Sequence, residues 1–292
     1  MPRQTSRKLE VFAIHAHFGE GQQQAVNYRR LFQSISGTMA RQRMVTVSSK
    51  SIAIPEFRKD QDLVILTCVE GEEGNPLVFN FVNATERIEQ LERGEKLATK
   101  THCAIDIARR EAVIEFNHRG AKAADVATAL QDIGSRLTGW GDLEIELTPV
   151  IDQSFLQAIN AFSRIRIATL KMVRPNPGWT DHVDNLTALA SESQGHVIEV
   201  TVNAERAKSL NKRGGIMGFI RHMVGETLPS FKAAKVTGVR EGEDAETTVT
   251  LANHIAHQRV IVELTVDGHV NDRDINNKIV RFLESRNPRA RQ

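Results

Sequence analysis

The strand-like segments of this chain come in pairs with short turns between them, and this arrangement limits the fold more than any other feature. Segments 101–107 and 112–117 flank a four-residue turn and make one such pair. Segments 62–69 and 76–82 make a second pair across the polar, glycine-containing stretch 70–75. Helical segments separate the pairs. We therefore expect an α+β fold of mostly antiparallel sheets with helices packed on one face, rather than a parallel βαβ sheet.

Apolar periodicity outlines the remaining elements. Further strands are expected at residues 9–16, 44–54, 143–150, 165–173 and 196–202, followed by a meander over 236–240, 247–252 and 258–266. Helices are expected at residues 26–35, 85–92, 121–137, 155–161, 183–191, 215–228 and 271–285.

The length of 292 residues and a hydrophobic content of 40% suit two ordinary domains, each with its own core. Pro149 interrupts the strand signal at 143–150 and marks the expected boundary, with the proline-rich turn around Pro175 as the alternative. We expect an N-terminal α+β domain at residues 1–150. A C-terminal α+β domain with a basic last helix and tail is expected at residues 151–292.

The chain lacks the signals of an exported or membrane protein. The longest apolar runs are short, and the first eight residues contain no signal-peptide stretch. Two cysteines are too few for a disulfide framework. A cytoplasmic protein without membrane association is expected, in which Cys68 and Cys103 are reduced, strand-embedded thiols.

No motif predicts a metal, a cofactor or a catalytic residue. Zinc requires three or four convergent ligands, and the chain has neither a CxxC pair nor an HExxH stretch. The histidines are interpreted as surface or strand-edge residues. One alternative stays open: Asp106 and Glu115 lie on adjacent expected strands and, with a histidine such as His102, would form a metal-dependent nuclease site. Asn117 stands where a common nuclease pattern has lysine, and a non-enzymatic role is favoured.

Charge is polarised along the chain although the formal net charge is only +2. Acidic residues gather at 70–73, 142–146 and 241–246, whereas basic residues surround the Gly214–Gly215 helix start and occupy the last helix and tail. Such polarisation suits the phosphate backbone of a duplex, and an aromatic content of 5% argues against base stacking on single strands. The predicted phosphate contacts are Lys208, Lys212, Arg213, Arg221, Arg281, Arg286 and Arg289. A mixed, solvated surface is the alternative.

The order of elements resembles that of the Rex-type phage-exclusion DNA-binding proteins and related bacterial phage-defence proteins. The segments that carry the resemblance are 27–32, 62–66, 78–81, 101–106, 113–117, 143–151 and 165–177. The resemblance implies a two-domain α+β protein, often dimeric, that binds DNA without strong sequence preference and acts in phage defence. It transfers no individual functional residue.

The favoured hypothesis is a sequence-nonspecific nucleic-acid-binding component of a bacterial phage-defence system, with double-stranded DNA as the favoured target. A homo-oligomer or a partner protein is expected. Two alternatives remain, the nuclease that uses Asp106 and Glu115, and a protein-interaction subunit of a larger defence complex.

Overall fold

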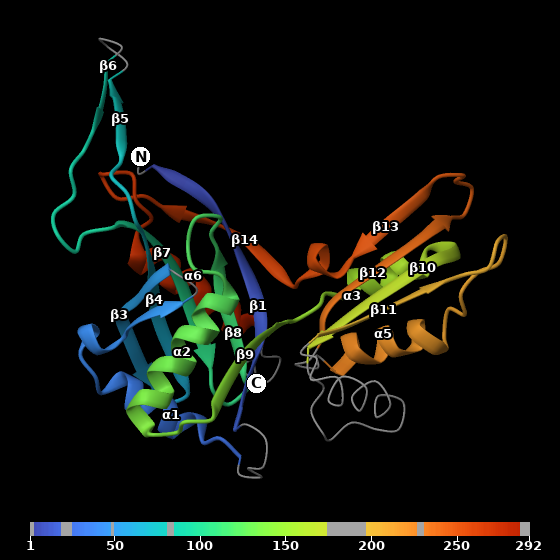
Figure 1. The fold of residues 1–292 in the computed structure, drawn as a ribbon, viewed down its shortest axis with the longest axis horizontal. Helices are drawn as coiled ribbons and strands as arrows, with labels where there is room; N and C mark the ends of the chain where they lie inside the picture. The colour runs from blue at the N-terminus through green and yellow to red at the C-terminus, as the bar shows by residue number, and fades with distance from the viewer. Residues whose placement is uncertain are drawn as a thin grey trace. The chain divides into compact units, whose positions relative to one another are not determined.

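The computed structural model describes residues 3–18, 25–47, 50–80, 85–173, 197–226 and 231–286. The chain divides into two compact units. Unit 1 combines Met1–Leu147 with His257–Gln292, and unit 2 is Thr148–Ala256. Both units are built from antiparallel strands and helices (Figure 1), so the predicted α+β class is confirmed.

Unit 1 contains one large antiparallel sheet and a separate small hairpin. The sheet has the strand order β14-β1-β8-β7-β4-β3-β2, and β9 also pairs with β1. Its strands are β1 (Gln4–Phe18), β2 (Met44–Val47), β3 (Lys50–Asp60), β4 (Leu63–Glu72), β7 (Leu97–Asp106), β8 (Glu111–Phe116), β9 (Leu143–Pro149) and β14 (His257–Glu263). The β7–β8 pair is the hairpin that the sequence predicts.

Helices cover both faces of the unit 1 sheet. Cys103 and Ile105 of β7 belong to the core that contains side chains of α1 (Tyr28–Ser36) and α2 (Ala123–Thr138). The alternate β7 residue His102 faces the opposite side, where it contacts α6 (Asp272–Ser285). Figure 1 shows α2 in front of the sheet and α6 behind it. The sheet is therefore a buried middle layer.

The predicted hairpin of 62–69 with 76–82 is wrong. β4 continues through Glu72 and pairs with β3 and β7, so stretch 70–75 is not a hairpin turn. Instead β5 (Leu77–Asn80) pairs with β6 (Thr85–Ile88) in a separate two-stranded sheet. β6 also overturns the helix expected at 85–92, because a Thr next to a loop is as compatible with a strand as with a helix cap.

Unit 2 is a four-stranded sheet with helices on one face. Its strand order is β11-β10-β12-β13. The elements are α3 (Gln153–Asn160), β10 (Phe162–Val173), β11 (Val197–Asn203), α5 (Gly215–Glu226), β12 (Phe231–Arg240) and β13 (Glu246–Thr250). Side chains such as Phe155 of α3 and Ile220 of α5 share one core with Leu170 and Val236 of the sheet. The helix expected at 183–191 lies outside the described residues.

The second predicted domain, 151–292, extends beyond unit 2, which is Thr148–Ala256. The division at Thr148 lies close to the expected boundary, but the last segment returns to unit 1. β14 pairs with β1 from Gln4↔Glu263 to Glu10↔His257, and α6 packs on β7 and β8. The strand and helix of 258–285 are locally as predicted. Their periodicity does not say which sheet they join, because any open edge accepts an antiparallel strand.

None of the helices in the described part of the chain is both long enough and apolar enough to cross a membrane.

Candidate functional site

The basic segment of unit 2 (residues 204–214) leads from β11 to α5 and is held along β10. The Ala204 N–H donates to the Arg166 carbonyl at 2.8 Å, and the Leu210 N–H donates to the Ile165 carbonyl at 2.9 Å. These bonds extend the β10–β11 pairing beyond Asn203. The cations of the segment therefore stand on an ordered backbone.

The end of this segment turns sharply into α5. The Asn211 side chain accepts hydrogen bonds from the Arg213 and Gly214 backbone N–H groups at 3.0 and 3.1 Å. Gly215 has a φ of +56°, a left-handed conformation that favours glycine. This turn presents Arg213 to solvent beside the start of α5, with Lys212 half-buried next to it. Lys208 is exposed and forms an ion pair with Glu205.

The Arg221 guanidinium is engaged in hydrogen bonds within unit 2. Its Nε donates to the Lys212 carbonyl at 3.0 Å, and its Nη2 donates to the Asn160 side chain. The guanidinium thus ties α5 both to the basic segment and to the end of α3. We interpret Arg221 as a residue that positions Lys212.

The remaining predicted contacts belong to unit 1. Arg281 is exposed on α6, whereas Arg286 is half-buried and pairs with Glu111 at 2.9 Å. Glu111 also pairs with Arg109, which donates to the Leu283 carbonyl at 2.9 Å. This network fixes the end of α6 to the β7–β8 hairpin. Arg289 lies outside the described residues.

The helix-free face of the unit 2 sheet carries polar residues that the sequence reasoning missed. Lys171 of β10 and Lys235 of β12 are exposed there. Two cross-strand hydroxyl pairs lie on the same face, with the Thr169 and Thr201 Oγ1 atoms of β10 and β11 3.0 Å apart and the Thr237 and Thr248 Oγ1 atoms of β12 and β13 2.9 Å apart. The alternation of these residues with buried ones along β10 and β12 is the signal that identifies such a face.

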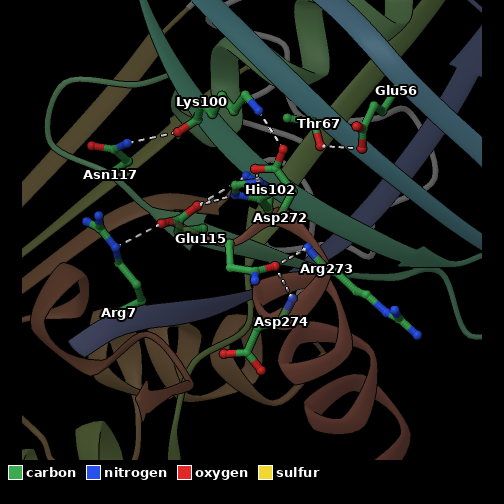
Figure 2. Close-up of polar contacts among 11 residues, drawn as sticks. Arg7, Glu56, Thr67, Lys100, His102, Glu115, Asn117, Asp272, Arg273 and Asp274 are labelled. Carbon is green, nitrogen blue, oxygen red and sulfur yellow. Dashed lines mark hydrogen bonds and ion pairs between the residues drawn. The ribbon is translucent and has the colours of Figure 1, made fainter. Parts of the chain in front are cut away.

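A network of charged and polar side chains links β1, β7, β8 and the start of α6 in unit 1, with His102 and Glu115 buried at its centre (Figure 2). His102 of β7 is 1% exposed and lies between two carboxylates. Its Nδ1 is 2.7 Å from Glu115 Oε2 on β8, and its Nε2 is 3.0 Å from Asp272 Oδ1 at the first residue of α6. Each ring nitrogen therefore faces a carboxylate oxygen.

Further cations flank the two carboxylates. Arg7 Nε on β1 is 3.4 Å from Glu115 Oε1, and Lys100 Nζ on β7 is 2.5 Å from Asp272 Oδ2. Burial raises the pKa of Asp272, but hydrogen bonds from Lys100 and His102 outweigh it and hold that pKa below its usual range. The start of α6 is thereby fixed to the sheet by charge.

This chain of charges is suited to holding α6 in place rather than to binding a metal. Glu115 and Asp272 contact different nitrogens of His102, so the three groups do not converge on one point. Within the ranges that the structure describes, no three His, Cys, Asp or Glu side chains are grouped to hold a metal ion. Sequence reasoning named Glu115 and His102 but had no means of finding Asp272, which is distant in sequence.

Asp106 and Glu115 do not come together as the nuclease alternative requires. Asp106 lies four residues beyond His102 along β7, about 13 Å at the usual strand rise, and is the cross-strand partner of Glu111. Its carboxylate accepts a hydrogen bond from the Arg109 N–H at 3.0 Å. Glu115 is bound to His102 at the other end of the hairpin.

The two cysteines are buried, as the sequence suggests. Burial raises the pKa of the Cys68 thiol to about 12 and raises that of Cys103 well above its usual value. A thiol of this kind is a poor nucleophile at neutral pH, because the thiolate is the reactive form.

Comparison with known proteins provides no family for this chain. No protein-family model matches it. No curated protein matches it either.

Proposed function

We propose that this protein binds nucleic acid without sequence preference, with duplex DNA as the favoured target, as a component of a bacterial phage-defence system. The observation that carries the binding proposal is the basic segment of unit 2. Lys208, Lys212 and Arg213 stand on one short segment whose backbone is fixed by β10, by Asn211 and by Arg221. The defence role rests on the resemblance to the Rex-type proteins.

The chemistry of unit 2 favours phosphates over bases. Lysine, arginine and threonine side chains are frequent phosphate contacts, and the helix-free sheet face supplies Lys171, Lys235 and paired threonines. Backbone N–H groups at the start of α5 add to the attraction for anions. A surface of this composition neutralises phosphate charge and carries little information about sequence.

A salt series tests this proposal. The purified protein is titrated into a labelled random-sequence duplex between 50 and 200 mM salt, with and without magnesium. The double variant Lys212→Ala/Arg213→Ala should bind more weakly on every sequence, and the slope of log K against log salt should fall by about 1.8 for two lost phosphate contacts. The control Lys59→Ala/Arg87→Ala removes the same charge from unit 1 and should change neither quantity.

Three results would count against the proposal. Absent binding at low salt would leave the interaction-subunit alternative. An unchanged slope in the Lys212/Arg213 variant would exclude the basic segment as the contact. Cleavage of the duplex only with magnesium would overturn the non-enzymatic interpretation and would require a catalytic site other than Asp106 with Glu115. For the defence role, phage plating on bacteria that express the wild type should be reduced, and the same variant should lose that reduction.

A further inference from the structure

Strand β11 is an edge of the unit 2 sheet (Figure 1). Among the residues that the structure describes, β11 pairs with β10 alone, from Ile167↔Asn203 to Val173↔Val197. An edge strand offers a row of backbone N–H and C=O groups to another strand. Its sequence, Val-Ile-Glu-Val-Thr-Val-Asn, is rich in β-branched residues and contains neither proline nor lysine, the residues that commonly protect such an edge.

The direction of the free backbone groups follows from the register. Ala204 donates to the Arg166 carbonyl, so the even-numbered residues of this strand turn their N–H and C=O groups toward β10. The odd-numbered residues turn theirs outward. These residues are Val197, Glu199, Thr201 and Asn203, which together present eight backbone groups.

The side chains of β11 are apolar on the face that α3 and α5 cover. Ile198, Val200 and Val202 lie opposite the core residues Met172, Leu170 and Ala168. The core extends to β11 only in part, because Val202 is 37% exposed and the other two are half-buried. A further strand beside β11 would complete this face.

We propose that β11 pairs antiparallel with β11 of a second copy of this chain, with the twofold axis at Val200. In this register Val197 faces Asn203 of the partner subunit and Glu199 faces Thr201 of the partner subunit. All four outward residues then occupy hydrogen-bonded positions, and all eight backbone groups are used. No charged side chain meets a like charge.

The apolar side chains take the positions between these hydrogen-bonded pairs. Ile198 faces Val202 of the partner subunit and Val200 faces its own copy. Side chains at such non-hydrogen-bonded sites are closest together, and β-branched pairs stabilise a sheet there. The two half-covered cores thereby continue into one another.

Other registers fit less well. Moving the axis to Glu199 opposes the two Glu199 carboxylates and pairs five residues in place of seven. Moving it to Thr201 also pairs five residues and leaves the backbone groups of Val197 unused. β11 is complementary to itself in hydrogen-bonding parity and in side chains, and for this reason a second copy is the occupant.

Two measurements test the proposal on the full chain. The first is the molar mass by light scattering and sedimentation at several concentrations. Wild type should dimerise. Thr201→Glu places a carboxylate opposite Glu199 of the partner subunit, and Thr201→Lys places an ammonium there. Both variants lose the same hydroxyl, yet the dimer dissociation constant should be about tenfold higher for Thr201→Glu than for Thr201→Lys.

The second measurement is disulfide trapping. Val200→Cys meets its own copy at a Cα separation of about 4.5 Å, within the range of a disulfide, and should form a covalent dimer under mild oxidation. The control Glu199→Cys faces Thr201 of the partner subunit and should not cross-link. A monomeric wild type would overturn the proposal. So would a dimer in which both Thr201 variants behave alike, or one in which Val200→Cys fails to cross-link.

Discussion

Replacing Glu115 with glutamine should reduce the stability of unit 1 more strongly than any other isosteric change in the unit 1 sheet. Glu115 is 2% exposed and its carboxylate is shared by three donors. Oε2 lies 2.7 Å from His102 Nδ1 and 3.3 Å from the His102 backbone N, and Oε1 lies 3.4 Å from Arg7 Nε. Glutamine keeps the shape of the side chain but removes its charge.

The three contacts of Glu115 contribute differently to the free energy of unfolding. The Arg7 side chain is 32% exposed, so its pair with Glu115 is screened by water and contributes below about 1 kcal/mol. The His102 contact is short, buried and charge-assisted, and a hydrogen bond to a charged group is worth about 1.5–3 kcal/mol. We expect Glu115→Gln to lower the free energy of unfolding by about 2–3 kcal/mol. Glu115→Ala should cost about 3–5 kcal/mol, because it removes one partner of a buried polar pair and leaves His102 Nδ1 buried without it.

Urea unfolding, followed by far-ultraviolet circular dichroism, measures the loss in the free energy of unfolding. Hydrogen exchange read on peptides of β7, β8 and α6 assigns the loss to unit 1. The control is Glu56→Gln, which changes an exposed carboxylate of the same sheet and should shift stability by less than about 0.5 kcal/mol. A loss below about 1 kcal/mol for Glu115→Gln would refute the reasoning, since it would mean that the carboxylate charge contributes little to the contact with His102.

Three further predictions follow from individual residues. The pKa of Asp272 is lowered in the fold, so its stabilising effect is present above about pH 4 and is lost as the pH falls through the folded-state pKa. Urea titrations should therefore give a stability difference between wild type and Asp272→Asn that is constant above about pH 5 and shrinks below about pH 4. The two buried thiols, with the pKa of Cys68 raised to about 12, should resist a thiol reagent at pH 8 in the folded protein and react fully in urea; modification of the folded chain within minutes would contradict their burial. A Cβ at Gly238 would lie 2.6 Å from a backbone oxygen and 2.8 Å from the Phe162 ring, so Gly238→Ala should cost about 1–3 kcal/mol in thermal unfolding, whereas Gly225→Ala, with open space around it, should not destabilise unit 2.

Local patterns predicted much of the fold. The apolar stripe that predicted a helix at 121–137 corresponds to α2, and the expected pair 101–107 with 112–117 is the β7–β8 hairpin. Both predictions are correct because the residues that stabilise a helix or a tight hairpin lie near one another in the sequence. A helix stripe and a short turn are visible within a window of about twenty residues.

Local sequence patterns could not predict the contacts between segments that are distant in sequence. Nothing in the local sequence of Asp272 indicates that its carboxylate meets His102, some 170 positions earlier. The basic residues of the last helix were likewise grouped with those near Lys212, although they belong to the other unit. Charge counts along a chain indicate which residues attract anions and do not indicate which of them share a surface.

The pairing of β1 with β14 sets an order of assembly during synthesis. β1 leaves the ribosome before unit 2, and its partner β14 follows only after the whole of unit 2. Unit 2 is continuous and can fold while the sheet of unit 1 still lacks one edge strand and the helix that packs on β7 and β8. The nascent chain therefore passes through an interval with an open, apolar sheet, when aggregation competes with folding. A premature stop within 257–292 would make that interval permanent.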